Sequence, residues 1–300
     1  MSAAIVVVGD LMVDVVAALP GPLAHGSDTP ARITHVQGGS GANVAAWLAA
    51  AGADVAFAGR AGADPLGDAA VAALTGVTLA VERDRERPTG TCIVLVDPGG
   101  ERTMIPDAGA NDALELAELP PGEHLHLTGY VLLRDGSRPM ALRALALARE
   151  RGMTISVDPS SAAPLAAAPA FLDWIGGAGL LLPNEDEARV LTGEADPERA
   201  ARALARRLRT CSASGRTPPD SAEVVVKLGA QGAVWSDGER VLRAPAVAAE
   251  VVDTTGAGDA FAAGLLATRV AGAAPEEQLA AGCALAAGAV GVRGARPGYD

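Results

Sequence analysis

A carboxylate follows a glycine-rich turn at residues 253–259, which read Asp-Thr-Thr-Gly-Ala-Gly-Asp. The apolar, β-branched residues 247–252 before this turn predict a strand. A helix is predicted from about Gly258 onward by the spacing of Phe261, Gly264, Leu265 and Thr268. Backbone N–H groups at the start of such a helix bind anions, and the helix dipole strengthens the site. Asp259 then either caps the helix or acts on a group beside the bound anion.

A second glycine-rich turn precedes another predicted helix near the N-terminus. Residues 38–43 read Gly-Gly-Ser-Gly-Ala-Asn, and Gly52 would end a helix whose apolar face contains Val44, Trp47, Leu48 and Ala51. By itself, this turn is explained either by tight packing or by a ligand that lies close to the backbone.

Together the two strings resemble the two signatures of the ribokinase-like (PfkB) carbohydrate kinases. They stand in the same order, about 215 residues apart, and the resemblance covers essentially the whole chain. It implies that Asp259 is the catalytic base. It also implies that an anion hole is formed by the backbone of Gly256, Ala257 and Gly258.

Two further segments resemble the nucleotide site of this family. Asn184 and Glu187 match its Asn-x-x-Glu motif at the phosphate and Mg²⁺ site, although acidic residues are also common where a helix begins. The turn after the predicted strand at residues 223–227 matches the place where the family binds ATP, and it contains Lys227, Gly229 and Gly232. Lys227 replaces a common Thr and either meets a phosphate or is an ordinary solvated side chain.

The resemblance assigns two more sites to the C-terminal part of the chain. Residues 280–290 predict an Ala/Gly-rich helix that would line the adenine pocket with Cys283, Ala284 and Ala287. Asp253 and Thr255 would hold a monovalent cation such as K⁺. A core helix packed on the sheet is compatible with both assignments.

The sugar would lie between the first signature and a small lid. The resemblance implies that sugar hydroxyls approach Gly38 and Gly39 and that Asn43 hydrogen-bonds one of them. Asp14 lies in an apolar run, where an unpaired buried carboxylate is costly, so it faces either solvent or a polar ligand.

A β-hairpin is predicted where the turn Asp97-Pro-Gly-Gly100 joins residues 91–96 to residues 102–105. Hairpins do not belong to a parallel sheet, so we assign residues 10–36 and 89–106 to the lid. The resemblance implies that such a lid covers the sugar and often forms a homodimer. Arg102 on the hairpin would face the substrate or form a surface salt bridge.

Alternating strands and helices predict an α/β fold, a three-layer α/β/α domain over residues 1–300 with a mostly parallel central sheet. The predicted strands are at residues 5–8, 53–57, 124–127, 154–157, 180–182 and 223–227, and predicted helices include residues 68–74 and 143–151. Ligands bind at the carboxyl ends of such strands, and the candidate residues all follow strand ends.

Composition limits the function classes. The formal charge of −12 without a basic cluster argues against nucleic acid or an anionic membrane as partner. Cys92, Cys211 and Cys283 show no metal-binding spacing, so reduced thiols are expected. Neither a signal peptide nor a membrane-spanning run is apparent, which indicates a cytoplasmic protein. A polar loop is expected at residues 210–221.

The predicted activity is transfer of the ATP γ-phosphoryl group, with Mg²⁺, to a hydroxymethyl group of a small sugar. Ribokinases usually have Asn at the position of Met12, Lys at that of Ser40, and an acid near Gly129 or Tyr130, so ribose is not favoured over fructose or a keto-sugar acid. A sugar acid would need a nearby Arg, and the stretch that begins at Asp158 supplies none. One alternative is a nucleoside kinase of the adenosine type, in which Tyr130 or Trp47 would stack on the base. Another is a sugar or nucleotide sensor without catalysis. A Walker-type kinase is excluded because its Gly-rich motif is absent.

Overall fold

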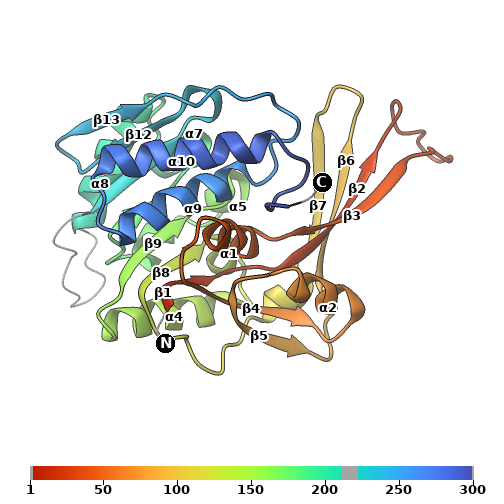
Figure 1. Ribbon diagram of the computed structural model, residues 1–300, viewed down its shortest axis with the longest axis horizontal. Helices are drawn as coiled ribbons and strands as arrows, with labels where there is room; N and C mark the ends of the chain where they lie inside the picture. Colours follow the sequence, from red (N-terminus) through yellow and green to blue (C-terminus); the bar gives the residue numbers. More distant parts are fainter. Residues whose placement is uncertain (1–2, 211–221, 299–300) are drawn as a thin grey trace.

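The computed structural model describes residues 3–210 and 222–298, and it contains two separate sheets. The larger sheet has nine strands (Figure 1) in the order β13-β12-β11-β10-β9-β8-β1-β4-β5. Only the two pairings at one edge, β11 with β12 and β12 with β13, are antiparallel. In chain order, the strands are β1 (Ala3–Val8), β4 (Val55–Gly62), β5 (Thr78–Asp84), β8 (Gly122–Thr128), β9 (Thr154–Asp158), β10 (Leu180–Leu181), β11 (Glu223–Lys227), β12 (Ala233–Ser236) and β13 (Val241–Ala244).

Helices cover both faces of this sheet, because its central strands alternate apolar side chains between two cores. In β1, Ile5 and Val7 belong to one core, whereas Val6 and Val8 belong to the other. The first core includes side chains of α1 (Ser40–Ala50), α2 (Pro65–Ala72), α9 (Ala257–Val270) and α10 (Pro275–Val290). The second includes side chains of α3 (Tyr130–Leu133), α4 (Arg138–Glu150), α5 (Ala162–Ala166), α6 (Phe171–Trp174), α7 (Glu185–Thr192) and α8 (Pro197–Thr210). Short 3₁₀ turns lie at η1 (Gly109–Ala113) and η2 (Gly229–Gln231). This arrangement confirms the predicted three-layer α/β/α fold.

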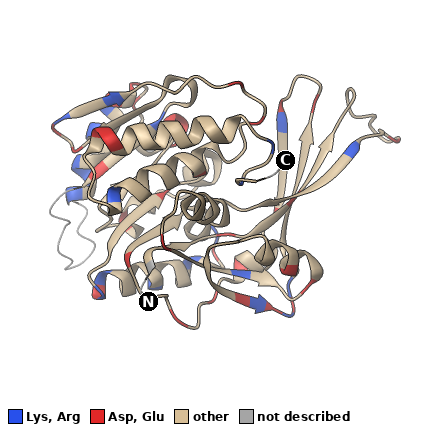
Figure 2. Cartoon of the chain, in the orientation of Figure 1, with Lys and Arg blue, Asp and Glu red and all other residues tan. Residues whose placement is uncertain are grey.

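The second sheet has four strands and projects from the body (Figure 1). Its order is β3-β2-β6-β7, formed by β2 (Met12–Ala18), β3 (Arg32–Gly38), β6 (Gly90–Val96) and β7 (Arg102–Asp107). The predicted hairpin is present as β6 and β7, which pair antiparallel. We call this sheet the lid. Charged side chains are few on it, and Figure 2 shows basic segments on β3 and β7.

One predicted strand is wrong. Residues 247–252 form no strand, and the side chains of Val247, Val251 and Val252 are half or more exposed. The amides of Val252 and Asp253 instead donate to the carbonyl of Val290 at the end of α10. The β-branched composition was therefore a misleading signal.

Several boundaries also differ from the prediction. The sequence pattern missed β5, β12 and β13, and α10 begins at Pro275 rather than at residue 280. The predicted polar loop lies outside the described residues, apart from Thr210 at the end of α8. None of the helices in the described part of the chain is long and apolar enough to cross a membrane.

The start of α1 lies directly against the end of β1 because both backbones have glycine at the contact. A Cβ atom on Gly41 would lie 2.6 Å from the Cα atom of Gly9. This contact fixes the position of the start of α1, which contains Ser40 and Asn43, at the carboxyl edge of the sheet.

We therefore expect Gly41→Ala to lower the free energy of unfolding, since helix propensity favours Ala but the backbone of β1 blocks the added methyl group. Gly288→Ala is the matched control, because a Cβ atom at that position in α10 would meet nothing within 4 Å. That variant should be more stable by up to about 1 kcal/mol. Urea unfolding followed by circular dichroism measures both; equal stabilisation by the two substitutions would contradict the steric argument.

Candidate active site

Asp259 lies in the first turn of α9, and its carboxylate is bound to the first signature. Ser40 Oγ donates to Asp259 Oδ1 at 2.7 Å, and Asn43 Nδ2 donates to Oδ2 at 2.9 Å. The N-cap residue of α9 is Gly256, with φ 75°, and no side chain caps the helix. Asp259 is therefore not an N-cap, so the structural role considered from the sequence is wrong.

The surroundings of Asp259 hold its carboxyl group close to the point of ionisation near neutral pH. Burial raises its pKa most, the hydrogen bonds from Asn43 and Ser40 lower it, and the nearby charge of Asp158 raises it again. The result is a pKa of about 7. A carboxylate with such a pKa can accept a proton from a hydroxyl group placed beside it and release it later.

The N-terminus of α9 next to Asp259 offers donors for an anion. The amide of Ala257 donates to Thr254 O at 3.3 Å, and the first amide with a partner four residues back is that of Ala260, which donates to Gly256 O at 2.8 Å. The preceding amides of Gly258 and Asp259 have no acceptor in the helix by its geometry. A Cβ atom on Gly258 would lie 3.6 Å from Lys227 Nζ, so the side-chain ammonium group stands next to these amides.

Lys227 is neither solvated nor free. Its Nζ atom lies 2.5 Å from Asp158 Oδ2, and the two side chains are 14% and 6% exposed. Burial lowers the pKa of Lys227, but the charges of Asp158 and Glu187 outweigh burial and raise it, so the side chain is a cation. Asp158, at the end of β9, was not singled out from the sequence; its position in a strand-end Asp-Pro was the available signal.

Asn184 and Glu187 lie together as the motif predicts, but they bind each other. Asn184 N and Nδ2 each donate to one oxygen of Glu187 at 2.8 Å, and Glu187 N donates to Asn184 Oδ1 at 2.8 Å. Burial and the charge of Asp158 raise the pKa of Glu187 to about 7, against the opposing charge of Lys227. The pair thus forms a capping box for α7 and also brings an acid close to the Lys227–Asp158 pair.

This acid does not form a closed metal site. Among the described residues, no group of three or more His, Cys, Asp or Glu side chains could hold a metal ion. The donor set fits Mg²⁺ that enters with nucleotide phosphates and water, which is how this ion is usually bound. Glu187 and Asp158 would then face its hydration shell.

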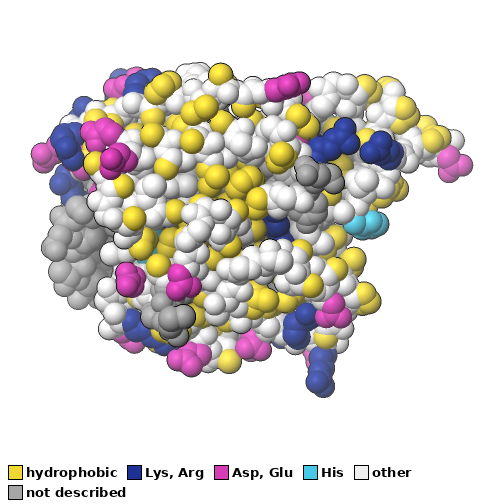
Figure 3. All heavy atoms as spheres, viewed as in Figure 1, with side chains coloured by type: hydrophobic (Ala, Val, Ile, Leu, Met, Phe, Trp, Pro, Cys, Tyr) yellow, Lys and Arg dark blue, Asp and Glu magenta, His cyan; other side chains and the backbone are white. Residues whose placement is uncertain are grey.

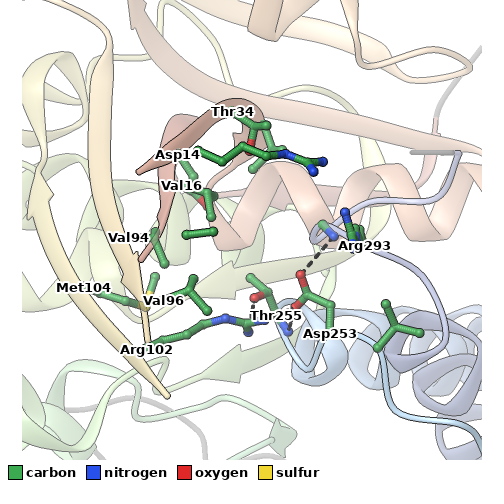
Figure 4. Close-up of a pocket in the computed structure, with 15 residues that line it drawn as sticks. Asp14, Val16, Thr34, Val94, Val96, Arg102, Met104, Asp253, Thr255 and Arg293 are labelled. Carbon is green, nitrogen blue, oxygen red and sulfur yellow. Dashed lines mark hydrogen bonds and ion pairs between the residues drawn. The ribbon is translucent and has the colours of Figure 1, made fainter. Parts of the chain in front are cut away.

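A cavity of about 560 Å³ lies under the lid, and the loop before α9 contributes Asp253 and Thr255 to its wall (Figure 4). Asp14, on β2, lines the cavity and is only 6% exposed, so the solvent-facing alternative is wrong. Burial and the charge of Asp10 raise the pKa of Asp14 to about 6, and Arg296 lowers it. No hydrogen bond to its carboxylate is observed from any described residue, which leaves it available to a ligand.

The same cavity is lined by apolar lid side chains and by arginines (Figure 4). The apolar ones are Val16, Ala18, Val36, Val94, Val96 and Met104, with Val252 opposite. Arg32, Arg102 and Arg293 add positive charge to its wall. The sequence prediction of a sugar site omitted Arg32 and Arg293.

Gly38 and Gly39 are packed against neighbouring residues of the cavity wall and do not border open space. A Cβ atom on Gly38 would meet the Asp14 carboxylate at 2.6 Å, and one on Gly39, with φ 90°, would meet Asp10 O at 2.6 Å. Arg296, which the sequence reading missed, is 2% exposed and donates to Asn43 Oδ1 at 3.0 Å and Gly38 O at 2.7 Å. No motif marks Arg296, because its partners lie more than 250 residues away.

The two glycines of the predicted nucleotide turn differ in their surroundings. A Cβ atom on Gly229 would meet nothing within 4 Å, whereas one on Gly232 would lie 2.0 Å from Ala244 O. Gly232 is therefore required for packing, and Gly229 borders open space.

The predicted adenine positions on α10 differ in the same way. Cys283 is buried in the core, Ala284 is exposed and Ala287 is half-buried, so only the last two present side chains outward. Cys92 and Cys283 are free, buried thiols, and Cys211 lies outside the described residues. Trp47 is buried and donates to Ala295 O at 2.9 Å, so the prediction that it could stack on a base is wrong.

Asp253 and Thr255, the predicted cation ligands, bind a side chain of the lid instead. Arg102 Nη2 lies 2.6 Å from Asp253 Oδ1, and Arg102 Nη1 donates to Thr255 Oγ1 (Figure 4). Asp253 Oδ1 also accepts from Thr255 N at 2.7 Å, and Oδ2 accepts from Gly294 N at 3.1 Å. The oxygens expected to coordinate K⁺ are thus occupied by donors, and in this conformation they do not fit that ion.

Comparisons with known proteins identify the family of this chain. The family model described as "pfkB family carbohydrate kinase" matches residues 2–300. A fructokinase of Escherichia coli is 32% identical over 279 residues, which cover 89% of this chain and 84% of the relative. A ribokinase of Mus musculus is 32% identical over 88% of this chain and 81% of the relative.

Among solved structures, the ribokinase of Arabidopsis thaliana complexed with ribose and ATP has a TM-score of 0.79 and 27% identity. The alignment covers 98% of this chain and 95% of that chain. The family match over nearly the whole sequence, with the same fold, shows that this chain belongs to the PfkB family of carbohydrate kinases.

Proposed function

We propose that the chain, as one domain, transfers the γ-phosphoryl group of ATP to a hydroxymethyl group of a small sugar. The observation that carries the proposal is the Asp259 carboxylate, which lies beside the free amides of α9 and is held by Ser40 and Asn43. Arg296 connects Asn43 to Gly38, the residue that packs against Asp14 in the cavity wall. A group that accepts a proton would therefore stand between the polyol and the phosphate.

In the proposed reaction, Asp259 accepts the hydroxyl proton as that oxygen bonds to the γ-phosphorus. The bond between the γ-phosphorus and the bridging oxygen of ADP breaks in the same transfer, and ADP keeps that bonding pair. The backbone of residues 256–258 and the Lys227 ammonium group are next to the oxygens of the moving phosphoryl, where positive potential stabilises the developing charge. Mg²⁺ bound to the nucleotide would neutralise part of the phosphate charge.

A nucleoside substrate is the second candidate, and the size of the cavity favours it. At about 560 Å³ with a largely apolar lid wall, the cavity has room for an apolar group besides a pentose. Asp14 would bind the sugar part of either substrate. ADP release with a panel of ketoses, pentoses and nucleosides separates the two candidates, and no release with any of them would favour a sensor.

We also propose that the chain forms a homodimer through the outer face of the lid. Ile33, Ile93 and Ile105 are 59%, 45% and 52% exposed, and Ile93 pairs with Ile105 across β6 and β7. Figure 3 shows apolar side chains on the surface of the projecting lid. A second lid would cover this apolar face, since exposed patches of this kind mark interaction sites.

Asp259→Asn should bind ATP but lower kcat by roughly 10²–10⁴-fold, which is the usual contribution of a general base. In the wild-type enzyme kcat/KM should fall as the pH decreases below about 7, because protonated Asp259 cannot accept the hydroxyl proton. Steady-state assays of ADP release measure both effects. They should cover about pH 5 to 9, the range in which perturbed carboxyl groups titrate.

Asp64→Asn is the matched control, because Asp64 is an N-cap that accepts from Gly67 N at the start of α2. It should lower stability and leave kcat unchanged. If Asp259→Asn behaved like this control, Asp259 would have no part in proton transfer.

Asp14→Ala should raise the KM for the sugar by at least about tenfold, since one factor of ten corresponds to about 1.4 kcal/mol and a charge-assisted hydrogen bond contributes about 1.5–3 kcal/mol. The KM for ATP should change little, because Asp14 lies under the lid and away from Lys227. An unchanged sugar KM together with a lower Tm would mean that Asp14 is only a structural residue.

Ile93→Asp should convert the dimer to a monomer, as measured by light scattering after gel filtration, because a carboxylate would be desolvated in the apolar interface. Leu79→Asp is the control: Leu79 is 42% exposed on β5, away from the lid. A monomeric wild-type protein, or a dimer that survives Ile93→Asp, would contradict the proposed interface.

A further inference from the structure

We propose that the guanidinium group of Arg102 is a built-in cation that ties the lid to the anion-hole loop and makes a bound monovalent metal ion unnecessary. We call its contacts with Asp253 and Thr255 the Arg102 bridge. The proposal goes beyond the proposed function, because it concerns how the lid and the phosphate site are held together.

The bridge joins strand β7 of the lid to the loop before α9. Among the described residues, no other hydrogen bond or ion pair joins β7 to residues 253–255. Arg102 is the first residue of β7, in the lid, and its two terminal nitrogens bind residues 151 and 153 positions later in the sequence. Figure 4 shows the side chain crossing from the lid strand to the loop. Thr255 directly precedes Gly256, the N-cap of α9, so the bridge acts on the segment that presents the anion-hole amides.

The two charged side chains of the bridge are largely shielded from solvent. The Arg102 and Asp253 side chains are 23% and 17% exposed. Burial raises the pKa of Asp253, but the Thr255 and Gly294 amides and the charge of Arg102 outweigh burial and hold it below its ordinary value. Asp253 is therefore an anion throughout the neutral range, and it is neutralised by a guanidinium group that makes two directed contacts.

A metal ion at the same place is disfavoured for two reasons. The carboxylate oxygens of Asp253 and the hydroxyl oxygen of Thr255 already accept hydrogen bonds from Arg102 and from backbone amides. In addition, the cavity wall contains three arginines, Arg32, Arg102 and Arg293, but only two carboxylates, Asp14 and Asp253, so its charge opposes an incoming cation. K⁺ would have to displace the Arg102 side chain before it could coordinate these oxygens.

The bridge also gives Arg102 a role as a positioning residue. When it forms, the lid strand that contributes Met104 to the cavity is held at a fixed distance from the loop before Gly256. Closure over the sugar and the order of the anion hole would thus depend on one side chain.

Arg102→Met, which keeps the length of the side chain without its charge, tests the proposal at constant ionic strength in KCl, NaCl or tetramethylammonium chloride. Wild-type kcat should vary by less than about twofold among the three salts, a difference of only about 0.4 kcal/mol. The variant should lose at least about tenfold in kcat in tetramethylammonium chloride. K⁺, or added guanidinium at non-denaturing concentration, should restore part of the loss.

A second measurement needs no catalysis. Without substrates, the Tm of Arg102→Met should rise when K⁺ replaces tetramethylammonium, because the vacated oxygens can then bind the ion, whereas the wild-type Tm should not change. If the wild-type chain phosphorylated none of the sugars or nucleosides tested, the proposed function would fail while this measurement still decided the role of Arg102. Arg102→Lys keeps a positive charge and should remain insensitive to K⁺ in both measurements.

Arg243→Ala is the matched control, because Arg243 forms an arginine–carboxylate pair of the same length, 2.6 Å, with Glu198 on the surface. It should show neither a loss of kcat nor a response to K⁺. Strong activation of the wild-type enzyme by K⁺, or a normal kcat in Arg102→Met, would overturn the proposal. So would a loss of kcat in Arg102→Met that neither K⁺ nor guanidinium restores, together with a Tm that does not change with K⁺.

Discussion

The contact between Asp259 and the first signature is the constraint on which the site depends. A carboxylate in the first turn of α9 accepts hydrogen bonds from Ser40 and Asn43, residues 219 and 216 positions away. Two contacts position these donors. Gly41 at the start of α1 packs against Gly9 after β1, and Arg296 donates a hydrogen bond to Asn43 Oδ1. Two glycine-rich turns are thereby brought to one ionisable group, and the proposed sugar and phosphate sites meet there.

Charge at the carboxyl edge of the sheet is balanced narrowly. The charge of Asp158 acts on both Glu187 and Asp259. Lys227, the single lysine among 24 basic residues, offsets these negative charges from a nearly buried position. Burial first, and then the charge of Asp158, raises the pKa of Glu187 and of Asp259 to about 7. In the proposed reaction, an arriving phosphate would add negative charge and favour the protonated forms of these carboxyl groups. Lys227 and the cation carried with the nucleotide would offset that charge, so that Asp259 can still accept a proton.

The sequence was most informative where a local pattern determines the structure. Strands such as β1 and β11 and the turns at Gly39 and Gly256 were predicted because short apolar runs and glycines with φ above +70° leave a recognisable pattern. The strand expected at residues 247–252 was wrong, since β-branched residues form a strand only where a partner edge exists. Ser40, Asp158 and Arg296 could not be assigned their contacts, because each partner lies far along the chain and nothing local specifies the pairing.

Arg102 shows that a side chain can occupy the place that a resemblance assigns to a bound cation. The motif around Asp253 indicates that positive charge is needed before the anion hole, and this requirement follows from a half-buried carboxylate that must be neutralised. A bound ion and a guanidinium group satisfy it equally well as charges, but only the side chain is covalently part of the lid. Supplying the charge from β7 therefore makes the electrostatics of the loop depend on the position of the lid, which an ion from solution would not do.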